Sequence, residues 1–181
     1  MPASAVVLTI DRVARGLSVA GAVAAGIILI VMSCHILAEI VLRTFFSSTT
    51  YVLEEMIGYG IATMSFLGLG YALNKGDLIR MNLVLVRLGD TTVRRIVEII
   101  CIVGALTFTG IASWYFFKSA VRDYSRGYVS ETLSETPLWL PPSIMLLGMI
   151  IFILQLLAYL LRVLVGDVSF ADERSSGFQD Q

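Results

Sequence analysis

Two adjacent carboxylates, Glu54 and Glu55, stand directly before a long apolar run of the sequence. Neighbouring side chains on a helix point about 100° apart, so this pair does not converge as a catalytic acid and base must. The positive end of a helix dipole stabilises acidic residues in the first turn by about 0.3–1 kcal/mol each, and one carboxylate suffices for this. Two interpretations follow. Both residues mark a helix start, or the second one holds Arg43 or a basic residue of another subunit.

A second set of ionisable residues, His35, Glu39 and Arg43, recurs every four positions and so shares one face of a helix. Ionisable groups at the centre of a membrane helix cost about 2.5–3.5 kcal/mol each and mark proton or ion paths. At about 1.5 Å per residue from Gly16, however, Glu39 lies roughly 35 Å along the helix, near the far interface. The sequence therefore favours a structural role, then contact with a partner protein, and last a proton relay.

Other signals of catalysis or cofactor binding are missing from the sequence. It contains no phosphate-binding loop, no nucleophile elbow and no HExxH motif, and its single histidine cannot supply both axial ligands of a bis-histidine haem. Cys34 and Cys101 fall inside apolar stretches without metal-ligand spacing, so we interpret both as buried small hydrophobic residues. We therefore predict no enzymatic activity, no cofactor or metal, and no binding of nucleic acid.

The elements that carry these residues are long and apolar. Of the 181 residues, 57% are hydrophobic and 15% are charged, whereas about a quarter are charged in a typical soluble domain. The charges cluster, and the neutral stretches between them are long enough to cross a ~30 Å hydrocarbon core as helices of about 20 residues. We predict an all-α membrane protein with a single integral membrane domain over residues 1–181. Its four transmembrane helices should lie at about 16–42, 54–74, 95–117 and 140–163.

The distribution of basic residues predicts the orientation. Nine Lys and Arg residues lie in the N-terminal segment, the second loop and the C-terminal segment, against four in the first and third loops. Because basic residues concentrate on the cytoplasmic side, both termini are predicted to be cytoplasmic. The third loop, up to about Leu140, would then be the longest outside segment, and its polar composition predicts that only partners order it.

Residues near the membrane surface follow from amphipathic patterns. The segment at about 77–89 mixes basic and apolar residues as a helix lying in the interface does, so we predict an amphipathic interfacial helix between the second and third spans. Basic side chains there would meet lipid phosphates, and aromatic side chains suit the opposite interface. The predicted lipid-interface residues are Arg87, Arg94, Arg95, Trp114 and Trp139.

Small residues line one side of the second span, where Gly58, Ala62 and Ser65 recur at helical spacing. Helices in lipid associate through close packing of such residues, because lipid provides no hydrophobic drive. We therefore expect this span to lie tightly against another helix.

The stretch from Arg43 to Arg95 resembles the small membrane subunit of tripartite ATP-independent periplasmic (TRAP) transporters. The resemblance is carried by Arg43, by the acidic pair in "YVLEEMIGYG", by "FLGLGYALNKGDLIRMNLVLVRL", and by the basic start of the third span. The later "ETLSETPLWLPPSIMLLGM" is similar to the start of the family's fourth helix. The sequence departs from the family at Tyr51, where a tryptophan is usual, and at Leu78 and Asn82, where a histidine and an acid are usual.

This resemblance implies a component of a transporter in the bacterial inner membrane. A large multi-helix subunit would bind the sodium ions and the solute, a soluble periplasmic protein would deliver an organic acid, and this chain would be a fixed scaffold. The residues that we expect at partner interfaces are Arg43, Glu54, Glu55, Gly58, Ala62, Ser65, Gly68 and Arg80.

Two other functions are compatible with four membrane helices. The first is a membrane anchor of a respiratory oxidoreductase, which the single histidine argues against. The second is a small self-assembling exporter with Glu39 as its proton site. The length of the chain and the shallow position of Glu39 argue against that function.

Overall fold

Four helices make up the computed structural model, which describes residues 2–49, 52–75, 91–132 and 135–165. They are α1 (Pro2–Phe46), α2 (Leu53–Lys75), α4 (Thr91–Arg126) and α5 (Leu140–Val165). Each contains a segment long and apolar enough to cross a membrane, which confirms the prediction of four such helices. Within these described residues the only extended pairing is an isolated bridge between Val129 and Pro137.

The helices differ in length. α2 and α5 have 23 and 26 residues, or about 35 and 39 Å, close to the predicted spans. α1 and α4 have 45 and 36 residues, or about 68 and 54 Å, and extend well beyond the predictions. The interfacial helix predicted at 77–89, with Arg80 and Arg87, lies outside the described residues.

The two long helices continue because nothing stops them at the membrane boundary. Between Pro2 and Gly16 the sequence has neither glycine nor proline, and an Arg15–Asp11 ion pair of 3.1 Å spans one turn. α4 continues through polar residues until Gly127, whose φ of 61° suits glycine and ends the helix. The predicted bounds relied on the neutral stretches between charged residues, so they do not include helical extensions that contain charges.

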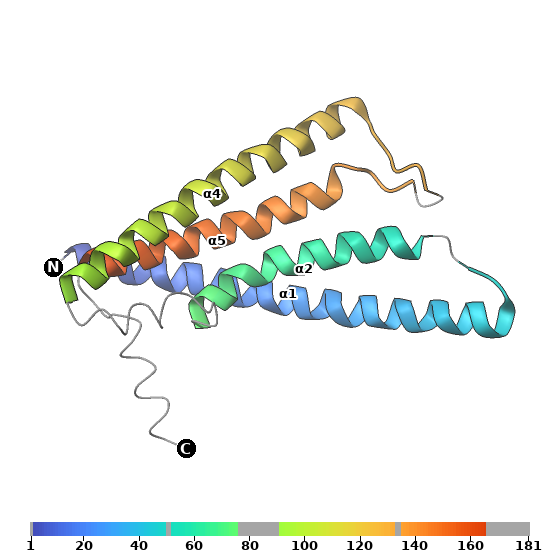
Figure 1. Ribbon diagram of the computed structural model, residues 1–181, viewed down its shortest axis with the longest axis horizontal. Coiled ribbons are helices and arrows are strands. Elements are labelled where there is room, and N and C mark those ends of the chain that lie inside the picture. The colour runs from blue at the N-terminus through green and yellow to red at the C-terminus, as the bar shows by residue number, and fades with distance from the viewer. Residues whose placement is uncertain (1, 50–51, 76–90, 133–134, 166–181) are drawn as a thin grey trace, which may run out of the picture.

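The helices form two antiparallel pairs, α1 with α2 and α4 with α5 (Figure 1). α5 is the central helix, since it packs against α1, α2 and α4, whereas α4 packs chiefly against α5. We call the ends of α1 and α4 and the starts of α2 and α5 the outer end, following the predicted topology. The opposite end is the inner end. The two pairs diverge toward the outer end (Figure 1).

Glycines set the closest contacts between helices α1, α2 and α5. A Cβ on Gly148 of α5 would lie 2.7 Å from the carbonyl carbon of Phe66 in α2. A Cβ on Gly21 of α1 would lie 2.9 Å from the carbonyl oxygen of Leu67, and one on Gly70 would lie 2.9 Å from Ser18 Oγ. Gly21, Gly70 and Gly148 thus bring the helices of this chain together, whereas Gly58 of the predicted stripe on α2 does not.

A buried polar pair lies at the same level. Ser18 and Gln155 are almost fully buried, and Ser18 Oγ lies 3.2 Å from Gln155 Oε1, to which it donates a hydrogen bond. Buried polar groups that bond each other across a helix contact avoid the cost of leaving them unpaired in lipid. This bond therefore fixes the register between α1 and α5.

Gly148 of α5 lies against the backbone of α2. We expect Gly148→Ala to lower the stability of the chain by about 1–3 kcal/mol, because the new methyl group meets backbone atoms that must shift. The measurement is the midpoint of thermal unfolding in detergent. Gly104→Ala, on α4, is the control, because a Cβ there has no neighbour within 4 Å. Equal midpoints for the two variants would contradict the close α2–α5 contact.

Candidate functional site

The acidic pair at the start of α2 divides into one exposed and one bonded carboxylate. Glu54 is exposed. Glu55 is half-buried and accepts hydrogen bonds from the hydroxyl of Tyr59, at 2.8 Å, and from the hydroxyl of Thr132. Because Thr132 belongs to the α4–α5 loop, Glu55 ties the start of α2 to the opposite helix pair. This partner lies 77 residues away and follows no local pattern, so it could not be predicted from the sequence.

The α4–α5 loop has its own backbone hydrogen bonds. After Gly127, the N–H of Ser130 donates to the carbonyl of Thr136 at 2.9 Å, and the N–H of Leu138 donates to the carbonyl of Tyr128 at 3.0 Å. The hydroxyls of Ser130 and Thr132 lie 3.1 Å apart. The expectation that only partners order this loop is therefore wrong for its described part, because backbone pairing and Glu55 already fix it.

The ionisable residues His35, Glu39 and Arg43 of α1 do not form one continuous polar face. Glu39 is 5% exposed and accepts a hydrogen bond from Thr49, which follows α1. Arg43 is exposed, and His35 Nε2 is buried without a hydrogen-bond partner in the described part of the chain. Glu39 and Glu55 have the same structural role at the outer end. Each carboxylate accepts a hydrogen bond from a loop threonine and so holds that loop against its helix.

At the inner end, Arg95 bonds to the last turn of α5. Its Nε donates to the carbonyl of Val163 at 3.0 Å and its Nη2 to the carbonyl of Leu164 at 3.1 Å. The last carbonyls of a helix lack partners within that helix, and a cationic donor also favours the negative end of its dipole. These nitrogens therefore have protein partners, while the predicted lipid contact of Arg95 stays a prediction. Glu98, one turn after Arg95 in α4, accepts a hydrogen bond from the hydroxyl of Tyr159 in α5.

Replacing Arg95 is expected to destabilise the contact between α4 and the last turn of α5 at the inner end. We expect Arg95→Gln to lower stability by about 1 kcal/mol, because charged hydrogen bonds contribute about 1.5–3 kcal/mol and this side chain is partly exposed. Faster amide hydrogen exchange in the last turn of α5 would report the loss. Arg12→Gln, on an exposed position of α1, should leave that exchange unchanged. Equal exchange in all three proteins would contradict the role of Arg95.

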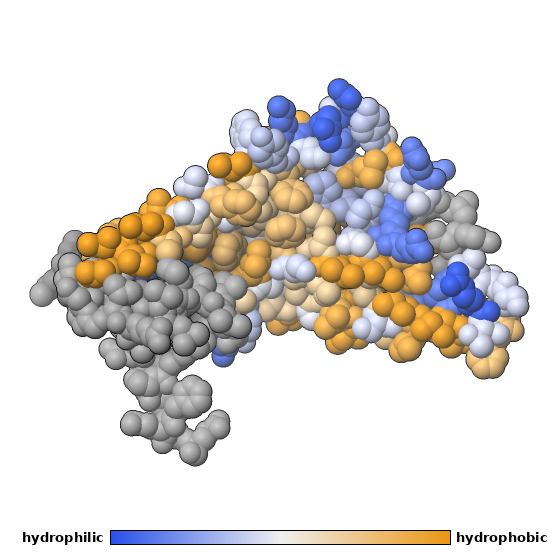
Figure 2. Space-filling view, viewed as in Figure 1, coloured by the Kyte–Doolittle hydropathy of each residue, from blue (hydrophilic) through white to orange (hydrophobic). Residues whose placement is uncertain are grey.

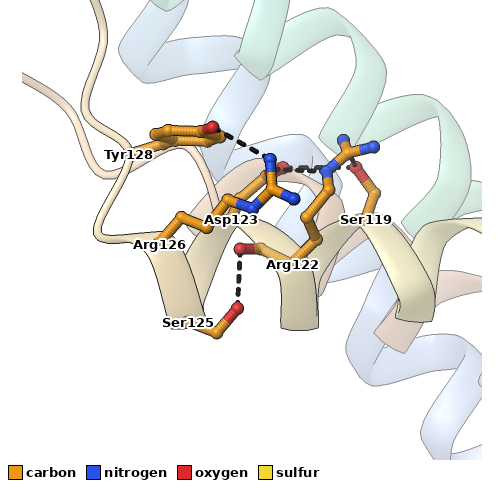
Figure 3. Close-up of polar contacts among 6 residues, drawn as sticks. All are labelled: Ser119, Arg122, Asp123, Ser125, Arg126 and Tyr128. Atoms are coloured by element: carbon orange, nitrogen blue, oxygen red, sulfur yellow. Dashed lines mark hydrogen bonds and ion pairs between the residues drawn. The ribbon is translucent and has the colours of Figure 1, made fainter.

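The outer end of α4 carries a cluster of polar contacts (Figure 3). Arg122 donates from Nε to Asp123 Oδ1 and from Nη2 to Ser119 Oγ, both at 3.1 Å. Arg126 donates from Nη1 to the hydroxyl of Tyr128 at 3.1 Å. Figure 2 shows hydrophilic residues gathered over this end of the molecule, whereas hydrophobic residues cover the middle.

The two tryptophans predicted at the lipid interface differ in their surroundings. Trp114 is 65% exposed and lies 6.3 Å from the ring of Phe117, centroid to centroid. Trp139 is half-buried and meets the ring of Tyr124 edge-on, with centroids 5.6 Å apart. Trp114 can therefore face lipid, whereas Trp139 also holds the end of the α4–α5 loop against α4. Of Arg94, only the helical backbone position is described.

One face of α2 is directed away from the rest of the chain. Gly58, Ile61 and Ser65 are exposed, and a Cβ added at Gly58 or Gly68 would have no neighbour within 4 Å. The buried residues of α2 lie on the opposite side of the helix. We call Gly58, Ile61, Ser65 and Gly68 the outward face of α2. Ala62, at its edge, is half-buried.

α1 and α4 also present large apolar surfaces outward, with exposed residues such as Ile30, Val31, Phe108 and Ile111. Cys34 and Cys101 lie on these surfaces and are exposed. The prediction that both are buried is therefore wrong within this chain, because apolar character in a membrane helix accompanies faces toward lipid as well as faces toward a core. No group of three His, Cys, Asp or Glu residues gathers for a metal ion in the described ranges.

Comparison with known proteins gave one result. Residues 32–166 match the family model described as "Tripartite ATP-independent periplasmic transporters, DctQ component". This match includes α2, α4, α5 up to its last residue, and the second part of α1. The comparisons with curated proteins and with solved structures gave no significant match.

Proposed function

We propose a scaffold role for this chain, which belongs to the family of DctQ components, the small membrane subunits of TRAP transporters. In this role it is a non-catalytic subunit that holds the large transport subunit in place during sodium-coupled uptake of an organic acid. The sodium ions and the solute bind to the large subunit. A soluble periplasmic binding protein delivers the solute.

The observation that carries this proposal is the outward face of α2. Membrane helices pack closely where small residues allow their backbones to approach, and Gly58, Ser65 and Gly68 leave that approach open. α2 already packs on α1 and α5 through its opposite side, so the outward face is available to a helix of another subunit. Glu54 lies at the outer end of this face and is exposed. The outward face of α2 and the exposed carboxylate of Glu54 therefore suit contact with a helix of the large subunit.

The buried polar groups also support a scaffold. Ser18 and Gln155, buried between α1 and α5, bond each other and so hold the two helices together. Solute and ion sites of transporters instead use broken helices and groups that converge near the bilayer midplane. α2, α4 and α5 run as continuous helices across their lengths. The family match gives no support to the alternative of a respiratory membrane anchor.

The distribution of basic residues supports the orientation in this proposal. With both termini in the cytoplasm of a multi-pass inner-membrane protein, Arg95 lies near the inner surface. The outer ends of the helices and the α4–α5 loop then face the periplasm, where the soluble binding protein is. Labelling of single cysteines placed in the two terminal segments tests the orientation, and reaction from the periplasmic side would contradict it.

Reconstitution tests the function itself. The chain is purified with its large subunit, and each is also purified alone, before insertion into vesicles with an inward sodium gradient. We expect uptake only when both subunits and the loaded binding protein are present, because the scaffold and the transport sites lie on different chains. Sodium-driven uptake by this chain alone, or full uptake by the large subunit alone, would contradict the scaffold role.

A further inference from the structure

One side of α4 points away from the rest of the bundle. α4 packs chiefly against α5 and lies at the edge of the bundle (Figure 1). Another side of it meets α2, where the ring of Phe116 lies 5.6 Å from the ring of Phe66, centroid to centroid. Exposed residues follow one another along the free side at a spacing of three or four positions, so they share one face of the helix. We call this set the outward face of α4, and it consists of Ile100, Gly104, Phe108, Ile111, Tyr115, Lys118 and Arg122.

The chemical character of this face changes once, from apolar to cationic. α4 carries no charged residue over 99–117, about 28 Å along the helix, which matches a hydrocarbon core of ~30 Å. Phe108 lies within this neutral stretch and is 75% exposed. Tyr115 lies near its outer end, as aromatic side chains do at a membrane interface. Lys118 and Arg122 follow directly and so lie at the depth of the lipid headgroups.

These two cations offer hydrogen-bond donors at that depth. In the described part of the chain the ammonium of Lys118 has no hydrogen-bond or ion-pair partner. Arg122 donates from Nε to Asp123 and from Nη2 to Ser119, both at 3.1 Å, and these bonds hold the guanidinium in place (Figure 3). Within the described ranges its Nη1 makes no bond, so it can donate to an acceptor outside the protein. A phosphate group is such an acceptor, and Lys and Arg are the side chains that bind it.

Asp123 compensates one of the three cations at this end of α4. It forms an ion pair of 3.1 Å with Arg122, but its side chain is 12% exposed and that of Arg122 is 56% exposed, so the carboxylate lies inward and the guanidinium outward. Arg126, one turn further, donates instead to the hydroxyl of Tyr128. The positive charges of Lys118 and Arg126 therefore remain at the surface.

The other acidic residues of the α4–α5 loop follow the chain away from this face. Thr132 bonds to Glu55 at the start of α2, so the loop turns toward α2. Glu131 precedes Thr132, and the N–H of Glu135 donates to the carbonyl of Thr132 at 3.1 Å. These two exposed carboxylates thus belong to a loop segment held at α2, whereas the outward face of α4 points away from the bundle.

We propose that the outward face of α4 is a binding site for an anionic phospholipid of the surrounding bilayer. The lipid phosphate accepts hydrogen bonds from Lys118 and Arg122, and an acyl chain lies along the neutral part of the face beside Phe108. A headgroup with its own ammonium would bring a further cation next to Lys118 and Arg126, so a lipid without one binds more tightly. Only the assignment to the outer leaflet rests on the proposed orientation.

The residue types of this face favour a lipid over a helix of another protein. Membrane helices approach one another through small residues, as on the outward face of α2. The outward face of α4 instead carries large side chains, and Phe108 and Tyr115 are its most exposed. They keep a second helix backbone at a distance, whereas a flexible acyl chain can lie between them. Gly104 gives that chain room, because a Cβ there would have no neighbour within 4 Å.

Fluorescence quenching by brominated lipids tests this proposal on the full-length chain. Trp114 precedes Tyr115 and is exposed, and Trp139→Phe removes the other tryptophan. The chain is inserted into vesicles of phosphatidylcholine and phosphatidylglycerol, in which one of the two lipids carries bromine on its acyl chains. Quenching of Trp114 gives the relative affinity of the two lipids at this face. We expect phosphatidylglycerol to bind about fivefold more tightly than phosphatidylcholine.

A single substitution removes the charge on which the preference depends. Lys118→Gln should bring the affinity ratio of the two lipids close to one, because the charge of Lys118 is uncompensated. This variant breaks no hydrogen bond in the described part of the chain, whereas Arg122→Gln would leave Asp123 without its ion-pair partner. Arg43→Gln is the matched control, since it removes an exposed charge at the outer end of α1. It should leave the ratio at Trp114 unchanged.

Three outcomes would overturn the proposal. An unchanged ratio in Lys118→Gln would show that Lys118 does not select the lipid. Equal losses in Lys118→Gln and Arg43→Gln would assign the preference to the overall charge of the chain. Quenching of Trp114 by neither brominated lipid would show that protein covers this face. The vesicles contain no large subunit, so none of these outcomes depends on the scaffold function.

Discussion

Replacement of Glu55 by lysine is expected to accelerate amide hydrogen exchange in the α4–α5 loop at least tenfold and to lower uptake by the complex. Glu55 accepts hydrogen bonds from Tyr59 and Thr132, and a lysine offers only donors at that place. Hydrogen bonds to a charged group contribute about 1.5–3 kcal/mol, and each 1.4 kcal/mol corresponds to a factor of ten. The amides of Ser130 and Leu138, which bond across the loop, are the ones to measure.

The neighbouring Glu54 provides a matched control for this prediction. It carries the same side chain at the start of the same helix, but it is exposed. Glu54→Lys should therefore leave exchange in the α4–α5 loop unchanged, even where it disturbs contact with the large subunit. Equal exchange in the two variants would show that the carboxylate of Glu55 does not hold the loop. Glu55→Gln, which keeps one acceptor oxygen, should have a smaller effect than lysine.

Replacement of Gly68 by leucine is expected to reduce the recovery of the large subunit with this chain by about tenfold. The added side chain has room within this chain, because a Cβ at Gly68 meets nothing within 4 Å. It would instead occupy the space through which a helix of another subunit approaches the outward face of α2. Overpacking typically costs about 1–3 kcal/mol, and this range includes the factor of ten.

Two measurements show whether this effect belongs to assembly. The thermal unfolding midpoint of the chain purified alone should be the same for Gly68→Leu and the wild type, since a Cβ at Gly68 has no neighbour within 4 Å and lies opposite the buried residues of α2. Gly110→Leu, at an open glycine of α4, tests whether bulk on any membrane-facing surface has the same effect. Wild-type recovery of the large subunit with Gly68→Leu would exclude the outward face of α2 as the contact.

The four apolar helices were predictable from the sequence, because a membrane helix requires only sufficient length and apolar composition. The helical extensions before Gly16 and after Phe117 were not predictable in this way, because both contain charged residues and the predicted spans were limited to the neutral stretches between charges. The start of α5 at Leu140 followed from Pro141 and Pro142, which suit the first turn of a helix.

Side-chain partners were harder to predict than helices. The sequence identified the acidic pair but gave no means to choose between Glu54 and Glu55, because their difference depends on where Thr132 returns to α2. The same holds for the glycines. Gly21 and Gly148 form close contacts and Gly58 does not, although all three lie in apolar helices. Composition reveals which residues permit close packing, whereas the tertiary arrangement decides which of them do so.

The unequal helix lengths make bilayer thickness a variable for this protein. Exposed apolar side chains of α1 run from Ile10 to Phe46, a distance of about 54 Å along the helix, whereas α2 is about 35 Å long. If α1 stood perpendicular to the membrane, part of this apolar surface would be exposed to water. The helix therefore tilts, or the bilayer around it thickens. Lipids with longer acyl chains reduce this mismatch for α1 and increase it for α2. The length of the lipid tails therefore sets the balance of strain between two helices that lie side by side.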